Sequence, residues 1–177
     1  MMCKAGKRIL IVEDTDSIAV LLAATLRQDG LIVDIAKTSQ AAMSKFVTSL
    51  ESTIPYDLLL VDLNLPDGDG ADLLSQMASF DVCPPSIVVS ADGSGAARSR
   101  AKAAGADDYV EKPFNLSLLK DKIEQKVSKL GKQRYGRKAL AFADAQRSLV
   151  NNYYGYLAEL ALDLENKINF AVFSNAN

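Results

Sequence analysis

Residues 56–70 read YDLLLVDLNLPDGDG, and this stretch decides the fold. A run of large apolar residues, long enough for a buried strand, ends on the carboxylate of Asp62 and then enters a turn rich in Pro and Gly. Strands that are apolar on both faces are typical of parallel sheets covered by helices. In open α/β sheets, ligands bind just beyond the carboxyl ends of the strands. The sequence therefore predicts that Asp62 faces a ligand crevice.

The strand-then-helix pattern around this stretch repeats along most of the chain. Short apolar runs predict five strands, at 9–12, 32–35, 58–62, 86–90 and 108–111. Each run is followed by a helical pattern, at 16–28, 39–50, 71–78, 93–104 and 115–130. Five such repeats predict an α/β domain over residues 7–130, with a doubly wound, five-stranded parallel sheet and helices on both faces.

The last part of the chain differs from these repeats. Residues 131–138, GKQRYGRK, predict a basic linker. Beyond the linker, the spacing of apolar residues between Val150 and Leu164 predicts a helical extension over 139–177. Whether this extension is a complete module or a truncated output domain stays open.

Composition narrows the class of protein. The chain has 177 residues, is 49% apolar and carries a formal net charge of -2. A slightly negative charge disfavours binding to nucleic acid through bulk charge. No apolar run reaches the roughly 18 residues of a membrane span, and Cys3 and Cys83 have no metal or redox spacing. We therefore expect a cytoplasmic protein that binds neither membrane nor nucleic acid.

The chain contains no histidine. This excludes a histidine general base, most zinc sites and a phosphohistidine on this chain. Any phosphoryl chemistry here must therefore use a carboxylate, a hydroxyl or a lysine.

Such groups stand at the carboxyl ends of the predicted strands: Glu13 and Asp14 after the first, Asp62 after the third and Ser90 at the end of the fourth, with Lys112 after the fifth. Carboxylates that converge on one crevice repel each other unless a cation neutralises them. Ligands that are all oxygen point to a hard divalent ion, Mg²⁺. The arrangement suits attack by Asp62 on a phosphoryl donor to give an acyl phosphate.

Plainer interpretations exist for the same residues. Asp62 alone would fit an ordinary strand-end cap, Ser90 a turn residue, and Lys112 a solvated surface lysine. Glu13 would fit a charge that offsets a helix dipole. Other acids of the region are expected to act only in turns and at helix N-termini, namely Asp67, Asp69 and Asp72.

Four motifs together resemble the receiver domain of two-component response regulators, of the chemotaxis-regulator-like kind. They are ILIVED at 9–14, LLLVDLNLPDGDG at 58–70, VVSA at 88–91 and GADDYVEKPF at 105–114. The resemblance covers about residues 7–130 and implies a flavodoxin-like sheet with strand order 2-1-3-4-5. The family of the C-terminal extension is unassigned.

The resemblance implies roles for the acidic residues. Glu13 and Asp14 match the acidic pair that holds Mg²⁺, and Asp62 matches the phosphoacceptor. Asn64 matches the position whose backbone carbonyl completes the metal site. One departure is that Glu13 stands where many members have Asp, which changes the reach of the carboxylate but keeps its charge.

The resemblance also implies roles on the neighbouring strands. Ser90 matches the switch hydroxyl, Lys112 the lysine that binds the phosphoryl group, and Tyr109 the rotating aromatic residue. A cis peptide bond between Lys112 and Pro113 is expected as well.

The implied function is phosphorylation-dependent response regulation. A histidine kinase or histidine phosphotransfer protein would supply the phosphoryl group to Asp62, with Mg²⁺ as cofactor. A switch at Ser90 and Tyr109 would then change partner binding or dimerisation, through the face of the fourth helix, fifth strand and fifth helix or through the C-terminal helix. The expected chemistry is limited to phosphorylation and dephosphorylation of Asp62 itself, without turnover of a separate substrate. The cognate kinase and the output pathway stay open.

Three alternatives remain. The first is a receiver-fold scaffold that acts by constitutive assembly through its tail. The second is the receiver portion of a larger hybrid kinase or regulator. The third is a phosphatase with an aspartyl intermediate, which Asn64 disfavours because such enzymes need an acid two residues after the nucleophile.

Overall fold

The computed structural model of the protein describes residues 6–52, 54–80 and 82–133. Of the predicted linker, only residues 131–133 are described, and they continue helix α5 (Leu116–Gln133). The predicted extension over 139–177 lies outside the described residues.

The centre of the domain is a parallel five-stranded sheet. Its strands are β1 (Arg8–Val12), β2 (Ile32–Ala36), β3 (Leu58–Val61), β6 (Ser86–Ser90) and β7 (Asp108–Glu111). They are hydrogen-bonded in the order β2-β1-β3-β6-β7, and every pair is parallel. This confirms the predicted order 2-1-3-4-5, counted over the strands of the main sheet.

One short feature escaped prediction. Within the expected turn after Asp62, β4 (Asn64–Leu65) and β5 (Gly68–Asp69) pair as a small antiparallel ribbon. Alternation of apolar and polar residues is not visible over two-residue strands, so the sequence shows this region only as a turn.

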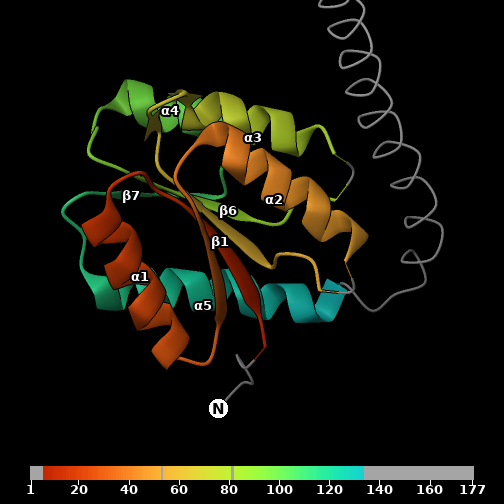
Figure 1. Cartoon of the computed structure of the whole chain (residues 1–177). Coiled ribbons are helices and arrows are strands. Elements are labelled where there is room, and N and C mark those ends of the chain that lie inside the picture. The colour runs from red at the N-terminus through yellow and green to blue at the C-terminus, as the bar shows by residue number, and fades with distance from the viewer. Residues whose placement is uncertain (1–5, 53, 81, 134–177) are drawn as a thin grey trace, which may run out of the picture. The chain divides into compact units, whose positions relative to one another are not determined.

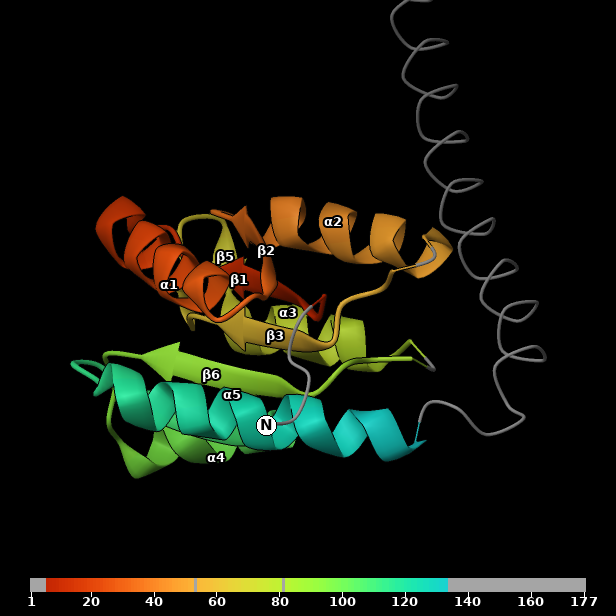
Figure 2. The same ribbon diagram turned by 90° about the horizontal axis from the view of Figure 1, so that it is seen from below.

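Helices cover both faces of the sheet. The helices other than α5 are α1 (Asp16–Gln28), α2 (Ser39–Glu51), α3 (Gly70–Ala78) and α4 (Gly95–Ala103). In Figures 1 and 2, α1 and α5 lie on one face and α2, α3 and α4 on the other. The predicted helix at 93–104 begins two residues late, because the Ser94 side chain accepts a hydrogen bond from the Ala97 amide and caps α4. Asn115 caps α5 by accepting hydrogen bonds from the amides of Ser117 and Leu118.

The core consists of two apolar layers separated by the sheet. On the side of α1 and α5, alternate strand residues pack in one cluster with residues of these helices, among them Ile9, Ile11, Leu58, Leu60, Leu26 and Ile123. The intervening strand residues are also fully buried and, because side chains alternate along a strand, face the other helices; they include Leu10, Leu59, Val61 and Val88. Burial on both faces explains the continuous apolar runs of the sequence.

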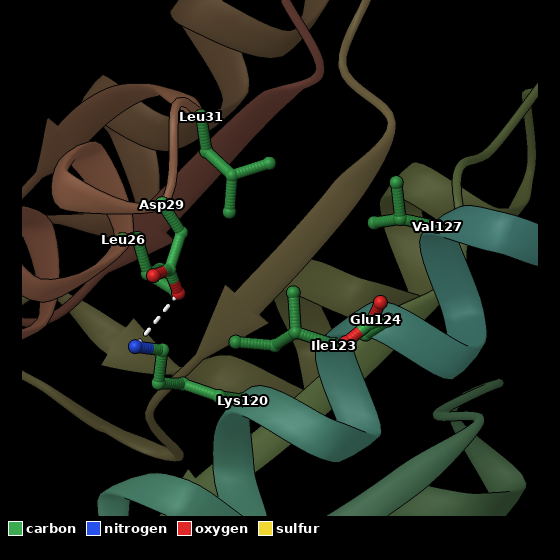
Figure 3. Close-up of a pocket in the computed structure, with 7 residues that line it drawn as sticks. All are labelled: Leu26, Asp29, Leu31, Lys120, Ile123, Glu124 and Val127. Atoms are coloured by element: carbon green, nitrogen blue, oxygen red, sulfur yellow. Dashed lines mark ion pairs between the residues drawn. The ribbon is translucent and has the colours of Figure 1, made fainter. Parts of the chain in front are cut away.

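A small recess lies between the end of α1 and α5 (Figure 3). Leu26 and Leu31 line one side, and Ile123 and Val127 line the other. Its volume is about 10 Å³, which is at the lower limit for holding one water molecule. The recess is therefore a small gap in the packing of α1 against α5, and none of the strand-end acids lines it.

An ionic network lies near the amino-terminal edge of the sheet, on the side opposite the strand-end acids. The Asp34 carboxylate accepts hydrogen bonds from the Tyr56 hydroxyl and from Arg8 Nε, each at 2.9 Å. The Arg8 guanidinium also lies over the Tyr56 ring, 4.5 Å from its centroid. Burial alone would raise the pKa of Asp34, but the bonds from Tyr56 and Arg8 outweigh it and hold this pKa below its ordinary value. The network thus ties β1 and β2 to the start of β3.

The pKa of Asp34 gives a pH-dependent prediction. A carboxylate whose pKa is depressed by folding stabilises the fold at neutral pH and loses this contribution as the pH falls through its folded pKa. We expect Asp34→Asn to unfold at lower urea concentration than wild type at neutral pH. The difference should shrink below the ordinary aspartate pKa of 3.8. Urea titrations of both proteins at the two pH values measure it, and a difference independent of pH would contradict the assignment.

No helix in the described part of the chain is long and apolar enough to cross a membrane.

Candidate functional site

Three carboxylates meet at the carboxyl end of the sheet. Glu13 directly follows β1 and Asp62 directly follows β3, and these strands are neighbours with Val12 opposite Val61. Oxygens of Glu13, Asp14 and Asp62 lie within 4.8 Å of one another. Glu13 and Asp62 are 2% and 6% exposed, whereas Asp14 is exposed. The topology therefore gathers the acids that the sequence placed on separate strands.

The ammonium group of Lys112 joins two of these acids. Lys112 Nζ lies 2.6 Å from Glu13 Oε2 and 2.6 Å from Asp62 Oδ2. The peptide bond between Lys112 and Pro113 is cis, as expected. Burial lowers the pKa of Lys112, but the hydrogen bonds and charges of Asp62 and Glu13 outweigh burial and raise it. Lys112 is therefore a fixed positive charge beside Asp62.

The chemistry of the donor set fits a hard divalent cation. The cluster offers only carboxylate oxygens, and Mg²⁺ prefers such ligands and is usually held by one or two carboxylates plus water. Three acids against one ammonium leave an excess of negative charge at this position, which a cation would neutralise. The cluster of Glu13, Asp14 and Asp62 is thus a candidate metal site.

Asp62 is also held from its backbone side. The amide of Asn64 donates to Asp62 Oδ1 at 3.1 Å. This contact orients one carboxylate oxygen while Lys112 holds the other. That the backbone carbonyl of Asn64 is a metal ligand stays a prediction.

Gly70, the first residue of α3, lies against the backbone of Asp62. Its amide donates to the Leu63 carbonyl at 2.8 Å. A Cβ atom placed on Gly70 would lie 2.0 Å from the Asp62 carbonyl oxygen. Only glycine allows α3 to begin this close to Asp62, a constraint that the sequence shows only as one more glycine in a turn.

Ser90 ends β6 as a fully buried residue. Its hydroxyl accepts a hydrogen bond from the Asp92 amide at 3.3 Å. The Tyr109 hydroxyl donates to the carbonyl of the same Asp92, and Tyr109 itself is half-buried. Ser90 and Tyr109, predicted from different strands, are therefore linked through one loop residue.

Two charged residues beside Tyr109 were missed at the level of sequence. Arg98 Nη2 lies 3.0 Å from Glu111 Oε2, and the Arg98 guanidinium lies 4.8 Å from the centroid of the Tyr109 ring. The sequence predicts the segment that carries Arg98 only as a helix, over 93–104, without a role for its charged residues. The available signal was an arginine in the first turns of that helix and a glutamate two residues after Tyr109.

Two acids of the turn after Asp62 accept hydrogen bonds from backbone amides at helix starts, as expected. Asp67 accepts from the amides of Ser39 and Gln40 at the start of α2, and these bonds lower its pKa. Asp69 caps α3 by accepting from the Ala71 amide at 2.8 Å, and Asp72 stands in the first turn of α3.

Comparison with known proteins identifies the family of the domain. The profile of the family described as response regulator receiver domain matches residues 9–124. The KDP operon transcriptional regulatory protein KdpE of Escherichia coli is 36% identical over 115 residues, which are 65% of this chain and 48% of that protein. The transcriptional regulatory protein PhoP of Escherichia coli is 38% identical over 117 residues, which are 66% of this chain and 50% of that protein. The chain thus spans about half the length of the curated relatives it matches.

Solved structures agree on the fold. A response regulator receiver domain protein (CheY-like) from Methanospirillum hungatei matches with a TM-score of 0.65 and 32% identity, over 73% of this chain and 99% of that one. The non-phosphorylated HemR receiver domain from Leptospira biflexa matches with a TM-score of 0.62 and 31% identity, over 69% of this chain and 94% of that one.

Proposed function

Because this chain belongs to the response regulator receiver domain family, we propose that it is a phosphorylation-dependent response regulator whose phosphoacceptor is Asp62. Histidine kinases or histidine phosphotransfer proteins are the partners that supply the phosphoryl group to such domains. We propose that such a partner transfers its phosphoryl group to this chain, and that the transfer takes place in the cytoplasm.

One observation carries the proposal. Lys112 Nζ lies 2.6 Å from Asp62 Oδ2 and 2.6 Å from Glu13 Oε2 in a nearly buried setting. An ammonium fixed beside a buried carboxylate stabilises an anion there, and phosphoryl transfer needs mainly positioning and neutralisation of charge. An ordinary strand-end cap would require neither the lysine nor the two further acids.

The proposed step forms one bond and breaks one. An Asp62 carboxylate oxygen attacks phosphorus, and the bond between phosphorus and the donor nitrogen or oxygen breaks, so the donor leaves with that electron pair. Lys112 binds an oxygen of the transferred group, and the Ser90 hydroxyl donates to another. Asn64 keeps the Asp62 carboxylate oriented through its amide.

Glu13, Asp14 and Asp62, with the Asn64 carbonyl, would hold Mg²⁺ in this proposal. The bound ion supplies neutralisation of the phosphoryl oxygens as charge redistributes. Glu13 then has two roles, because the same carboxylate is the partner of Lys112.

The response in this proposal is a change at Ser90 and Tyr109 that alters partner binding or homodimerisation through the face of α4, β7 and α5, or through the predicted C-terminal helix. A covalent group on Asp62 biases two arrangements of these elements. The relatives are about twice as long as the segment that matches this chain. The proposal therefore extends to this change in binding or dimerisation, and not to the process that it controls.

The proposed chemistry predicts a covalent adduct. Incubation of the chain with acetyl phosphate and Mg²⁺ should add the mass of one phosphoryl group, as measured by intact mass spectrometry. Asp62→Asn should abolish the adduct, because the amide is not a nucleophile for this transfer. Asp67→Asn is the matched control: it removes a nearby acid that accepts hydrogen bonds from backbone amides at the start of α2, and it should leave the adduct intact. An adduct that persists in Asp62→Asn contradicts the proposal.

A further inference from the structure

We infer that Arg98 and Glu111 form a latch that holds Tyr109, and through it the loop at 91–94, in the arrangement of the unphosphorylated protein. This inference rests on the proposed function of Asp62 and adds two positioning residues to it. Removing the latch should make phosphorylation of Asp62 faster.

The first part of the latch is the arginine. Arg98, in the first turns of α4, pairs with Glu111 at 3.0 Å and lies over the Tyr109 ring at 4.8 Å from its centroid. Tyr109 and Glu111 are two residues apart on β7, so both side chains point to the same side of that strand. One guanidinium therefore holds both residues and ties α4 to β7.

The second part is the contact between Glu111 and the loop. A Cβ atom placed on Gly93 would lie 2.2 Å from Glu111 Oε1. The backbone of the loop thus packs directly against the carboxylate that Arg98 holds. The Tyr109 hydroxyl adds a hydrogen bond to the carbonyl of Asp92, the preceding residue.

The latched loop is bonded to the proposed site. The Asp92 amide donates to Ser90 Oγ at 3.3 Å, and the Lys112 amide donates to the Ser90 carbonyl at 2.8 Å. A reorientation of the Ser90 hydroxyl toward a phosphoryl group on Asp62 alters its bond to Asp92. A shift of Asp92 in turn disturbs the bond from Tyr109, whose ring Arg98 covers. The latch therefore opposes the change that phosphorylation requires.

The size of the effect follows from exposure. The side chains of Arg98 and Glu111 are 45% and 50% exposed, and exposed ion pairs and exposed cation–π contacts are each weak. Such contacts shift a two-state equilibrium modestly. We expect roughly a threefold to tenfold increase in phosphorylation rate when the latch is removed.

The experiment compares variants of the full chain. Phosphorylation by acetyl phosphate with Mg²⁺ is followed by intact mass for wild type, Arg98→Gln, Glu111→Gln and the double variant. Lys102→Gln is the matched control, because it removes one positive charge from an exposed position of the same helix. Lys102 forms no ion pair with any described residue. Both single variants should be faster than wild type and the control, and the double variant should not exceed the faster single variant by more than about twofold, since the two residues act as one unit.

A second measurement is independent of phosphorylation. All tyrosines are replaced by 3-fluorotyrosine, and the Tyr109 resonance is assigned by its loss in Tyr109→Phe. Without any phosphodonor, Arg98→Gln should shift this ¹⁹F resonance, and Lys102→Gln should leave it in place. An unchanged resonance in Arg98→Gln, or a rate equal to or below that of the control, overturns the latch. If wild type takes up no phosphoryl group at all, the proposed function of Asp62 fails instead, while the ¹⁹F result still decides whether Arg98 holds Tyr109.

Discussion

Replacing Gly70 by alanine is expected to lower the free energy of unfolding by about 3 kcal/mol and to slow phosphorylation of Asp62 on the order of 10²-fold. The added Cβ atom would lie 2.0 Å from the Asp62 carbonyl oxygen and 2.9 Å from its carbonyl carbon. Both are backbone atoms, so no side chain can turn aside to relieve the overlap. The start of α3 or the backbone of Asp62 must move, and this moves the carboxylate that Asn64 and Lys112 hold.

The matched control for this substitution is Gly68→Ala, two residues earlier, in strand β5. A Cβ atom there would make an ordinary contact, 3.6 Å from Ser39 Oγ. Urea unfolding and the intact-mass assay should both give values close to wild type for this control. Equal behaviour of the two alanine variants would show that the close approach of α3 does not position Asp62.

Replacing Lys112 by methionine should destabilise the fold by about 3 kcal/mol at neutral pH and nearly abolish phosphorylation. The variant keeps a side chain of similar length but removes the ammonium that lies 2.6 Å from both Glu13 and Asp62. These two carboxylates, 2% and 6% exposed, would then face each other and Asp14 without a compensating charge. Loss of one partner from a buried ionic group leaves the remaining charges poorly solvated.

Magnesium distinguishes the electrostatic cause of this loss from a packing defect. A ligand that binds only the folded state stabilises it by mass action. Mg²⁺ should therefore raise the urea midpoint of Lys112→Met more than that of wild type, because the cation supplies the charge that the lysine had supplied. Phosphorylation should stay low, since the group that binds the phosphoryl oxygen is missing.

Lys120→Met is the control for Lys112→Met. Lys120 pairs with Asp29 at 2.8 Å (Figure 3), but this pair is more exposed, and surface pairs contribute less than about 1 kcal/mol. Its stability should change little and should not respond specifically to Mg²⁺. A loss as large as that of Lys112→Met would assign the effect to general surface charge.

Most of the fold could be predicted from the sequence, because the strands are buried on both faces. Runs such as 58–61 are then apolar throughout, and the polar residue that ends each run marks the carboxyl edge of the sheet. The strand-end acids could be predicted for the same reason, since parallel strands bring their carboxyl ends together. Helix ends were predicted less well: the N-cap of α4 is Ser94, one of several small residues that fit equally by sequence.

The contacts between elements could not be predicted in this way. In the sequence, Gly70 and Gly93 look like other turn glycines. In the folded protein, Gly70 approaches the backbone of Asp62, and Gly93 approaches the carboxylate of Glu111. Arg98 contacts residues on β7 that are 11 and 13 positions away. Pairings of exposed charges across such distances depend on how α4 packs on the sheet, and a single sequence carries no signal for that.

Glu13 contacts both the lysine and the acidic cluster. Its carboxylate reaches Lys112 while an oxygen remains within 4.8 Å of Asp14 and Asp62. The ammonium therefore bridges β1 and β3 in the unphosphorylated protein, and it neutralises part of the repulsion among the three acids.

The central claim is that Asp62, and not a neighbouring acid, receives the phosphoryl group. The most direct test is to phosphorylate the chain with acetyl phosphate and Mg²⁺, reduce the acyl phosphate with borohydride, and locate the reduced residue by tandem mass spectrometry. Reduction should convert Asp62 alone to homoserine. Conversion of Asp14 or Glu13 instead, or of no carboxylate in a chain that has gained phosphoryl mass, would contradict the account.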